Sequence, residues 1–270
     1  VAWYTSFFYV GAALSLSYGT NLNAFLDWRE VWLFAAVGPF IALLFVWLMI
    51  PSVKIKFEGQ SNWGLLDLRS ILANRKVIGF TLAYSAHTAE LMGFYTWIVA
   101  FLTFSQAGIN SGDLTSFLAI GTIASTVTLL AVPASIFGNE AARRFGRLKV
   151  LRTVMFGSAV VATILGFSST LPYPLVLLII VIYGVFVAAD SAVITAGVVD
   201  AADPANRGKA MAFYSLIGFL GGSIGPVTFG YMLDIGGGET TALGWRLGFF
   251  SLAFLVCLGP IATYFSHRRV

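Results

Sequence analysis

The chain has 270 residues, of which 58% are hydrophobic and only 10% are charged, and its formal net charge is +4. Because soluble domains carry about 25% charged residues, this composition excludes an ordinary soluble protein, and most of the surface must face lipid. The excess of Lys and Arg does not indicate nucleic acid binding, since these residues lie in short segments between apolar runs. We attribute them to membrane topology and expect no nucleic acid partner.

Eight apolar segments follow one another along the chain, each long enough for a helix that crosses a bilayer, which takes about 20 residues. They span residues 2–22, 30–50, 77–104, 113–137, 148–168, 173–198, 208–233 and 245–266. The runs are continuous and do not alternate in polarity, which excludes a transmembrane β-barrel. We therefore predict an all-α membrane protein, a polytopic bundle of eight transmembrane helices.

The basic residues between these segments predict the orientation of the chain. All Lys and Arg residues except Arg29 and Arg246 fall in connections that the alternating helices place on one side of the membrane. An excess of basic residues marks the cytoplasmic side. We therefore expect a multi-pass protein of the cell (inner) membrane, with lipid around it and its C-terminus in the cytoplasm.

The longest polar connection, residues 51–76, separates two predicted helices from six. It predicts a central cytoplasmic loop between two halves of one protein. Residues 1–50 then supply the last two helices of an N-terminal half, and residues 77–270 form a six-helix C-terminal half.

The first two and the last two predicted helices share an outline. In both pairs a helix of small residues and a short loop precede a Trp-Arg dipeptide that opens the next helix, at Trp28-Arg29 and Trp245-Arg246. Repeated halves are typical of secondary transporters, whose binding site lies where the halves meet.

Four stretches of the sequence together resemble the major facilitator superfamily. They are GWRLGFF at 244–250 with its partner DWREVWLF at 27–34, RRFGRLKVL at 143–151, the segment from DPANRGKAM to GYMLD at 203–234, and the long central loop. The resemblance implies that the eight predicted helices correspond to the fifth through twelfth of twelve. It also implies that four N-terminal helices of the same protein precede residue 1, and that these 270 residues alone do not transport.

Two features depart from the pattern of this family. Its cytoplasmic loop motif usually has an Asp just before the Arg-x-Gly-Arg core, here Arg144, Gly146 and Arg147, but Arg143 occupies that place. This puts in doubt the gating role that the family gives to the loop. The Gly-x-x-x-Gly-Pro pattern of drug-proton antiporters is absent from the helix where it is expected and appears at 221–226, which argues against drug efflux.

Three ionisable residues interrupt the apolar segments: His87, Glu90 and Asp190. A charge at mid-bilayer costs roughly 2.5–3.5 kcal/mol, so each must face protein or a water-filled cavity. Helical periodicity places His87, Glu90 and Trp97 along one stripe, and Tyr183 on the face of Asp190. By the resemblance, these two helices line a central cavity.

These residues are our candidates for function. A buried carboxyl group is easily kept protonated and can bind a proton from one side and release it to the other, so we expect Glu90 to couple transport to protons. His87, Asp190, Trp97 and Tyr183 are candidates for the substrate cavity. The alternatives are that His87 and Glu90 only satisfy each other or a neighbouring helix, and that Trp97 and Tyr183 only pack.

The function that fits these observations is a secondary active transporter of a small solute, working by alternating access and coupled to protons. We expect no ATP-driven transport, because no Gly-rich turn ends in Lys-Ser/Thr, and no cofactor, because no Cys/His cluster indicates a metal. We also expect no enzyme activity, because neither His87 nor His267 has partners for a catalytic triad in the sequence. Two alternatives stay open. One is a polytopic membrane enzyme that uses the buried His, Glu and Asp as acid/base groups, and the other is a non-transporting receptor or scaffold.

Overall fold

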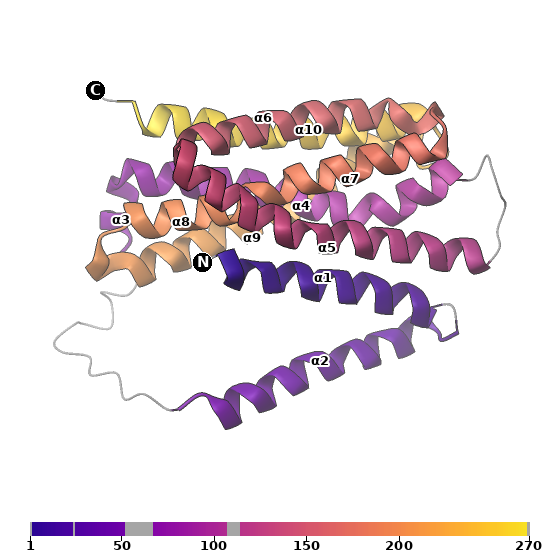
Figure 1. Cartoon of the computed structure of the whole chain (residues 1–270), viewed down its shortest axis with the longest axis horizontal. Helices are drawn as coiled ribbons and strands as arrows, with labels where there is room; N and C mark the ends of the chain where they lie inside the picture. Colours follow the sequence, from indigo (N-terminus) through magenta and orange to yellow (C-terminus); the bar gives the residue numbers. More distant parts are fainter. Residues whose placement is uncertain (1, 24, 52–66, 107–113, 269–270) are drawn as a thin grey trace.

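The computed structural model describes residues 2–23, 25–51, 67–106 and 114–268, and all the regular structure in these ranges is helical. Long helices run side by side in a bundle (Figure 1). The prediction of an all-α membrane bundle is therefore confirmed. The helices are α1 Ala2–Asn23, α2 Trp28–Met49, α3 Arg69–Ala73, α4 Arg75–Gln106, α5 Leu114–Phe145, α6 Arg147–Gly166, α7 Tyr173–Ala189, α8 Ser191–Ala201, α9 Arg207–Ile235 and α10 Ala242–Ser266, with 3-10 turns η2 Ser168–Thr170 and η3 Pro204–Asn206.

Within the described ranges, six helical segments are long and apolar enough to cross a membrane. They are Trp28–Met49, Ile120–Phe145, Arg147–Gly166, Tyr173–Ala201, Pro204–Ile235 and Ala242–Ser266. The other two predicted segments form α1 and α4, which are long enough but whose described residues do not reach the same mean hydropathy over a membrane-spanning length. The expected number of eight spans therefore stays a prediction.

The basic connections gather at one end of the bundle. The start of α4, the turn between α5 and α6, the start of α9 and the end of α10 all lie there (Figure 1). Arg29 in α2 and Arg246 in α10 belong to helix starts at the opposite end. This arrangement agrees with the one-sided charge distribution from which we predict a cytoplasmic C-terminus.

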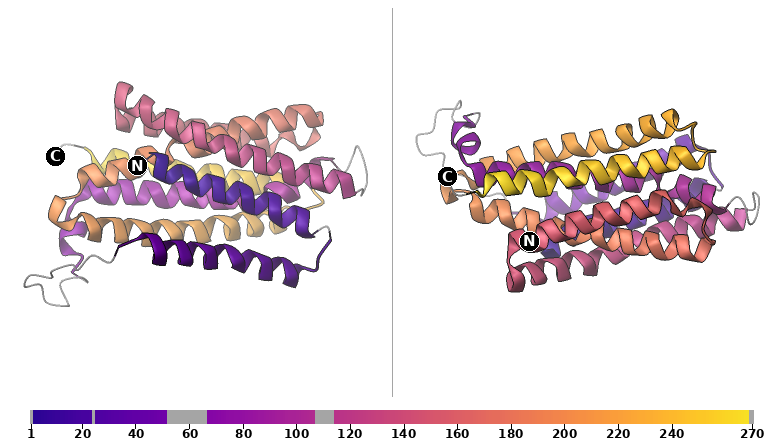
Figure 2. Two further views of the ribbon diagram at one scale, coloured as in Figure 1. Left: turned by 60° about the horizontal axis from the view of Figure 1, so that its bottom comes forward. Right: turned by 90° about the horizontal axis from the view of Figure 1, so that it is seen from above.

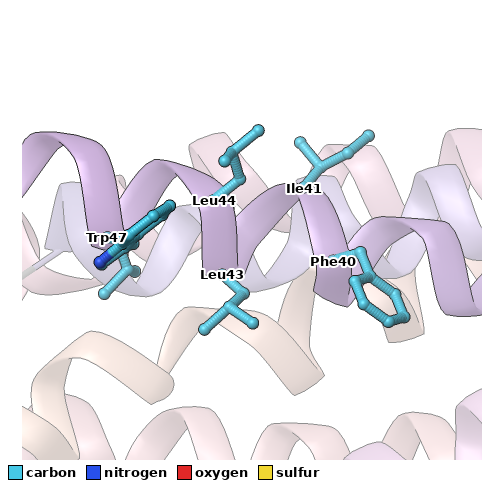
Figure 3. A pocket seen from close by; sticks show the side chains of 6 residues that line it. Phe40, Ile41, Leu43, Leu44 and Trp47 are labelled. Atoms are coloured by element: carbon cyan, nitrogen blue, oxygen red, sulfur yellow. The ribbon is translucent and has the colours of Figure 1, made fainter.

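Helix α2 lies at the edge of the assembly (Figures 1 and 2), and among the described helices it packs mainly against α1. None of its residues is buried. Large apolar side chains project from opposite sides of the helix, among them Leu44 and Phe40 (Figure 3). A hollow along this helix is lined only by its own apolar residues, so we assign it to the membrane-facing surface and not to a binding site.

Helices α4 and α9 approach closely because glycines line their contact. A Cβ atom on Gly221 would overlap the carbonyl oxygen of Ser85, and one on Gly225 would overlap that of Ala89. Small residues let the backbones of membrane helices come this near. The contact holds α4, which carries His87 and Glu90, in a fixed place.

The predicted span 173–198 corresponds to one membrane-crossing segment, Tyr173–Ala201, whose helix is interrupted. Helix α7 ends at Ala189 and α8 begins at Ser191, so the interruption is at Asp190. Gly138 of α5 packs against this point, where a Cβ atom would overlap the carbonyl oxygen of Ala189. Discontinuous helices are typical of the binding sites of transporters, so the break draws attention to Asp190.

Candidate functional site

Glu90 is fully buried where three helices meet. Ser158 of α6 donates a hydrogen bond from Oγ to Glu90 Oε1 over 2.7 Å, and the hydroxyl of Tyr183 of α7 donates to the same oxygen over 3.0 Å. Glu90 Oε2 has no hydrogen-bond partner among the described residues. One carboxyl oxygen is therefore held by two donors, and the other is free to carry a proton.

His87 and Asp190 face each other across α4 and the α7–α8 break. His87 Nδ1 lies 2.8 Å from Asp190 Oδ1, and both side chains are buried. The two atoms are within ion-pair distance but are not aligned as a hydrogen bond. In the part of the chain that the structure describes, His87 therefore pairs with Asp190, whereas Glu90 Oε1 accepts hydrogen bonds from α6 and α7.

Glu90 lies three residues after His87 on α4, so the His87–Asp190 pair and Glu90 lie within about one turn of the same helix. The three ionisable residues predicted within the apolar segments therefore form one buried cluster. Two of its members come from α4, and the third comes from the break in another helix.

A cavity of about 510 Å³ lies beside this cluster, between α1 on one side and α4, α8 and α9 on the other. His87 forms part of its wall. The rings of Tyr84 and Tyr214, which also line the cavity, stack with centroids 3.9 Å apart, and the hydroxyl of Tyr214 lies 2.8 Å from that of Thr195. The wall holds further aromatic, methionine and hydroxyl side chains, and none of its described residues is Lys, Arg, Asp or Glu.

A family model described as Major Facilitator Superfamily matches residues 102–270, from the end of α4 to the end of the chain. The chain belongs to this superfamily. It is a multi-pass integral membrane transporter of the major facilitator type, a class that moves small solutes. The family points to a transporter rather than to a membrane enzyme. A search of curated proteins found no match.

We predicted four residues for the substrate cavity: His87, Asp190, Trp97 and Tyr183. Among these four, only His87 lines the cavity just described. Tyr183 is fully buried and donates to Glu90, so it belongs to the carboxyl site. Trp97 lies away from the cavity, where its Nε1 donates to the carbonyl of Pro226 over 3.1 Å and its ring stacks on Phe229. The packing alternative for Trp97 is the one that its contacts support.

Ser158, Tyr84 and Tyr214 are site residues that the sequence did not predict. A single serine in an apolar helix does not indicate a functional site, so Ser158 is recognised only by its hydrogen bond to the buried carboxyl group of Glu90. Tyr84 did carry a signal, because it lies three residues before His87 and so shares its helix face.

The loop motif of the superfamily lies between α5 and α6. Gly146 has φ = 95°, in the left-handed region that favours glycine, which turns the chain from one helix into the next. Arg144 donates to Glu140 over 3.0 Å, and Arg143 pairs with the same carboxylate over 3.6 Å. These two arginines therefore bind an acid on their own helix.

Arg147 is the member of the motif that reaches another helix. Its Nη1 lies 2.7 Å from Asp200 Oδ2 and donates to the carbonyl oxygen of Ala196 over 3.1 Å. Both partners are in the last turns of α8. The motif lacks the usual Asp of its own loop, but Asp200 supplies a carboxylate from α8.

Other side chains bind the same helix end. Asn74 donates to the carbonyl of Ala201 over 2.9 Å, and Arg207 donates to that of Val199 over 3.2 Å. Carbonyls in the last turn of a helix have no partner within it, so these donors satisfy them. Helix α8 is thereby held at its C-terminal end by three elements and meets His87 at the other end through Asp190.

Proposed function

We propose that the protein is a secondary active transporter that moves a small organic solute by alternating access and couples this movement to protons at Glu90. The observation that carries the proposal is a fully buried carboxyl group one helical turn from a residue that lines the cavity. His87 lines the cavity, Asp190 pairs with His87, and Glu90 lies three residues after His87 on α4. The proposal includes the cell (inner) membrane as location and a cytoplasmic C-terminus, on the basis of the charge distribution.

The cavity wall favours an uncharged or cationic organic solute. Stacked tyrosines offer aromatic faces, which bind apolar rings and attract cations. Hydroxyls such as those of Thr88 and Ser191 offer hydrogen bonds. An anion would meet no Lys or Arg among the described lining residues.

Glu90 suits a proton site because its surroundings tolerate a change of charge. Ser158 and Tyr183 both donate to Oε1, and donation from a hydroxyl is compatible with a carboxylate or with a neutral acid protonated on Oε2. The group is sealed from solvent, so a proton needs a path to reach it. The path we propose runs from the cavity through His87 and Asp190.

The proposal is tested by flux into liposomes that contain the full-length protein. The probe is an uncharged or cationic aromatic compound chosen because it raises the melting temperature of the purified protein. With a pH gradient imposed, we expect the compound to accumulate above its equilibrium level, and a protonophore should abolish the accumulation. Equal flux with and without the protonophore would contradict proton coupling, and absence of any flux would contradict transport of this class of solute.

Replacing Tyr214 with Leu is expected to weaken binding of the same compound. The substitution removes one of the two stacked rings that line the cavity but keeps an apolar side chain. A contact between two aromatic rings contributes about 0.5–1.5 kcal/mol in addition to the burial of their surface. Loss of such a contact between Tyr214 and the compound should therefore raise the dissociation constant by up to about tenfold. Tyr231→Leu on the exposed surface of the same helix is the control, and an equal effect there in a calorimetric titration would contradict the assignment.

Replacing Arg147 with Ala is expected to open the cytoplasmic side of the cavity more often. The change removes the ion pair and hydrogen bond that hold the end of α8. Access is measured with the variant Ser215→Cys, whose thiol is labelled by a maleimide added on the cytoplasmic side. Since a partly exposed ion pair contributes at most about 1 kcal/mol, the labelling rate should rise by up to about fivefold.

The control for this experiment is Arg144→Ala, because Arg144 contacts only Glu140 on its own helix. Both variants lose one positive charge from the same turn. A labelling rate that is unchanged in the Arg147 variant, or raised equally in both variants, would show that the contacts of Arg147 with α8 do not control access to the cavity.

A further inference from the structure

Two cationic side chains and a histidine converge at the end of α10 that lies with the basic connections. Arg152 of α6 donates from Nη2 to the carbonyl oxygen of Thr263 over 2.8 Å. His267, which follows α10, has its Nδ1 3.1 Å from the same oxygen. The side chains of two different elements therefore meet at a single carbonyl group.

The ring of Tyr264 brings a second arginine to this place. The guanidinium of Arg152 lies 5.6 Å from the ring centroid, and that of Arg268 lies 4.5 Å from it. Arg268 also donates from Nη2 to the Tyr264 hydroxyl over 2.6 Å. Both guanidinium groups are thus held against one aromatic side chain.

No acid neutralises this group of cations in the part of the chain that the structure describes. Arg152 and Arg268 have no carboxylate within ion-pair distance there, and neither does the nearby Lys76. Burial lowers the pKa of His267, and the positive charges of Lys76 and Arg152 lower it further. The contrast with the α5–α6 turn is informative, because the arginines of that turn are paired with Glu140 and Asp200.

The surroundings of these cations are those of a membrane interface. Tyr264 is 44% exposed, and the adjacent Phe265 is 62% exposed. Exposed aromatic residues at a helix end mark the level of the lipid headgroups. A guanidinium group binds a phosphate through paired hydrogen bonds, and basic sites between helices on the cytoplasmic side bind anionic headgroups.

We propose that Arg152 and Arg268, with Lys76 beside them, bind the phosphate of an anionic phospholipid whose acyl chains lie against Tyr264 and Phe265. The site is independent of the proposed transport mechanism and requires only that this end of the bundle meets a leaflet with anionic lipid. The phosphate supplies the negative charge that the described residues lack at this place. The exposed rings distinguish a lipid from a free phosphate ion, which has no apolar part to contact them.

The test is native mass spectrometry and thermal unfolding of the purified full-length protein in detergent with added lipid. Phosphatidylglycerol should bind as discrete adducts and raise the melting temperature, whereas phosphatidylcholine and inorganic phosphate should not. In the double variant Arg152→Gln/Arg268→Gln, the affinity for phosphatidylglycerol should fall at least tenfold. Arg143→Gln/Arg144→Gln removes the same charge from the same end and should keep the affinity of the wild type.

An equal loss of affinity in both double variants would overturn the proposal, because it would show that total charge and not this site attracts the lipid. Equal stabilisation by inorganic phosphate would overturn the lipid part of it. Arg152 also bonds to Thr263, so the double variant can lose stability for that reason alone. The single variant Arg268→Gln avoids this problem, since Arg268 is exposed and follows the helix, and unchanged lipid affinity there would also contradict the site.

Discussion

Replacing Glu90 with Gln is expected to abolish accumulation of the solute driven by a pH gradient, while exchange of the solute across the membrane without a gradient continues. Gln has nearly the same shape as Glu, and its amide oxygen accepts the hydrogen bonds of Ser158 and Tyr183 as Glu90 Oε1 does. It cannot bind and release a proton. The variant therefore separates the packing role of this side chain from its proposed chemistry.

Gradient-driven uptake should fall at least about tenfold, which corresponds to a loss of roughly 1.4 kcal/mol or more of coupling. The control is Glu239→Gln, because Glu239 is exposed and only its backbone carbonyl is used, by Trp245. Uptake by the control should match the wild type. If the Glu90 variant retains gradient-driven uptake, Glu90 is not the proton site. If it loses both gradient-driven uptake and exchange without a gradient, the role of Glu90 is structural.

Replacing Gly225 with Ala is expected to destabilise the bundle. The new Cβ atom would overlap the carbonyl oxygen of Ala89, and because this is a backbone atom it cannot rotate away. Helices α4 and α9 must then separate and lose packing along their contact. Overpacking of this kind costs about 1–3 kcal/mol, so the melting temperature in detergent should fall by several degrees.

Gly208→Ala is the matched control on the same helix, where a Cβ atom would meet nothing within contact distance. Because Ala favours a helix over Gly by up to about 1 kcal/mol, this variant should be as stable as the wild type or slightly more stable. Equal melting temperatures for Gly225→Ala and Gly208→Ala would show that α4 and α9 are not in close contact. The position of Glu90 would then be in doubt as well.

Much of the bundle was predictable because the hydropathy of a segment indicates whether it is apolar enough to form a helix within the lipid bilayer. The predicted segments 30–50 and 245–266 correspond to α2 and α10 with ends that shift by a few residues. The break at Asp190 was not predictable in the same way, since no Pro or Gly marks it and one residue scarcely changes the mean hydropathy of a long segment. The division into halves and the four preceding helices stay predictions.

The site was predictable in its residue types but not in its pairings. The cost of burying a charge was enough to select Glu90, His87 and Asp190 from the sequence. Their partners depend on the register between helices, and Ser158 and Tyr183 are far from Glu90 along the chain. Periodicity alone does not supply that register.

The position of Trp97 shows a limit of the stripe argument. With 3.6 residues per turn, Glu90 and Trp97 are turned by similar angles from His87, roughly 60° and 80°, so they do share one side of α4. Trp97 lies about 15 Å farther along the helix axis than His87, because each residue adds 1.5 Å. At that level it contacts Pro226 and Phe229 of α9 and not the cavity.

Proton exchange on solute binding shows directly whether Glu90 is the proton site. The purified full-length protein in weakly buffered detergent solution would be mixed with the stabilising solute, and the pH change recorded with an indicator dye. We expect the wild type to take up or release protons on binding and Glu90→Gln to bind the solute with no such change. Equal proton exchange in the two proteins, or none in the wild type, would contradict this assignment.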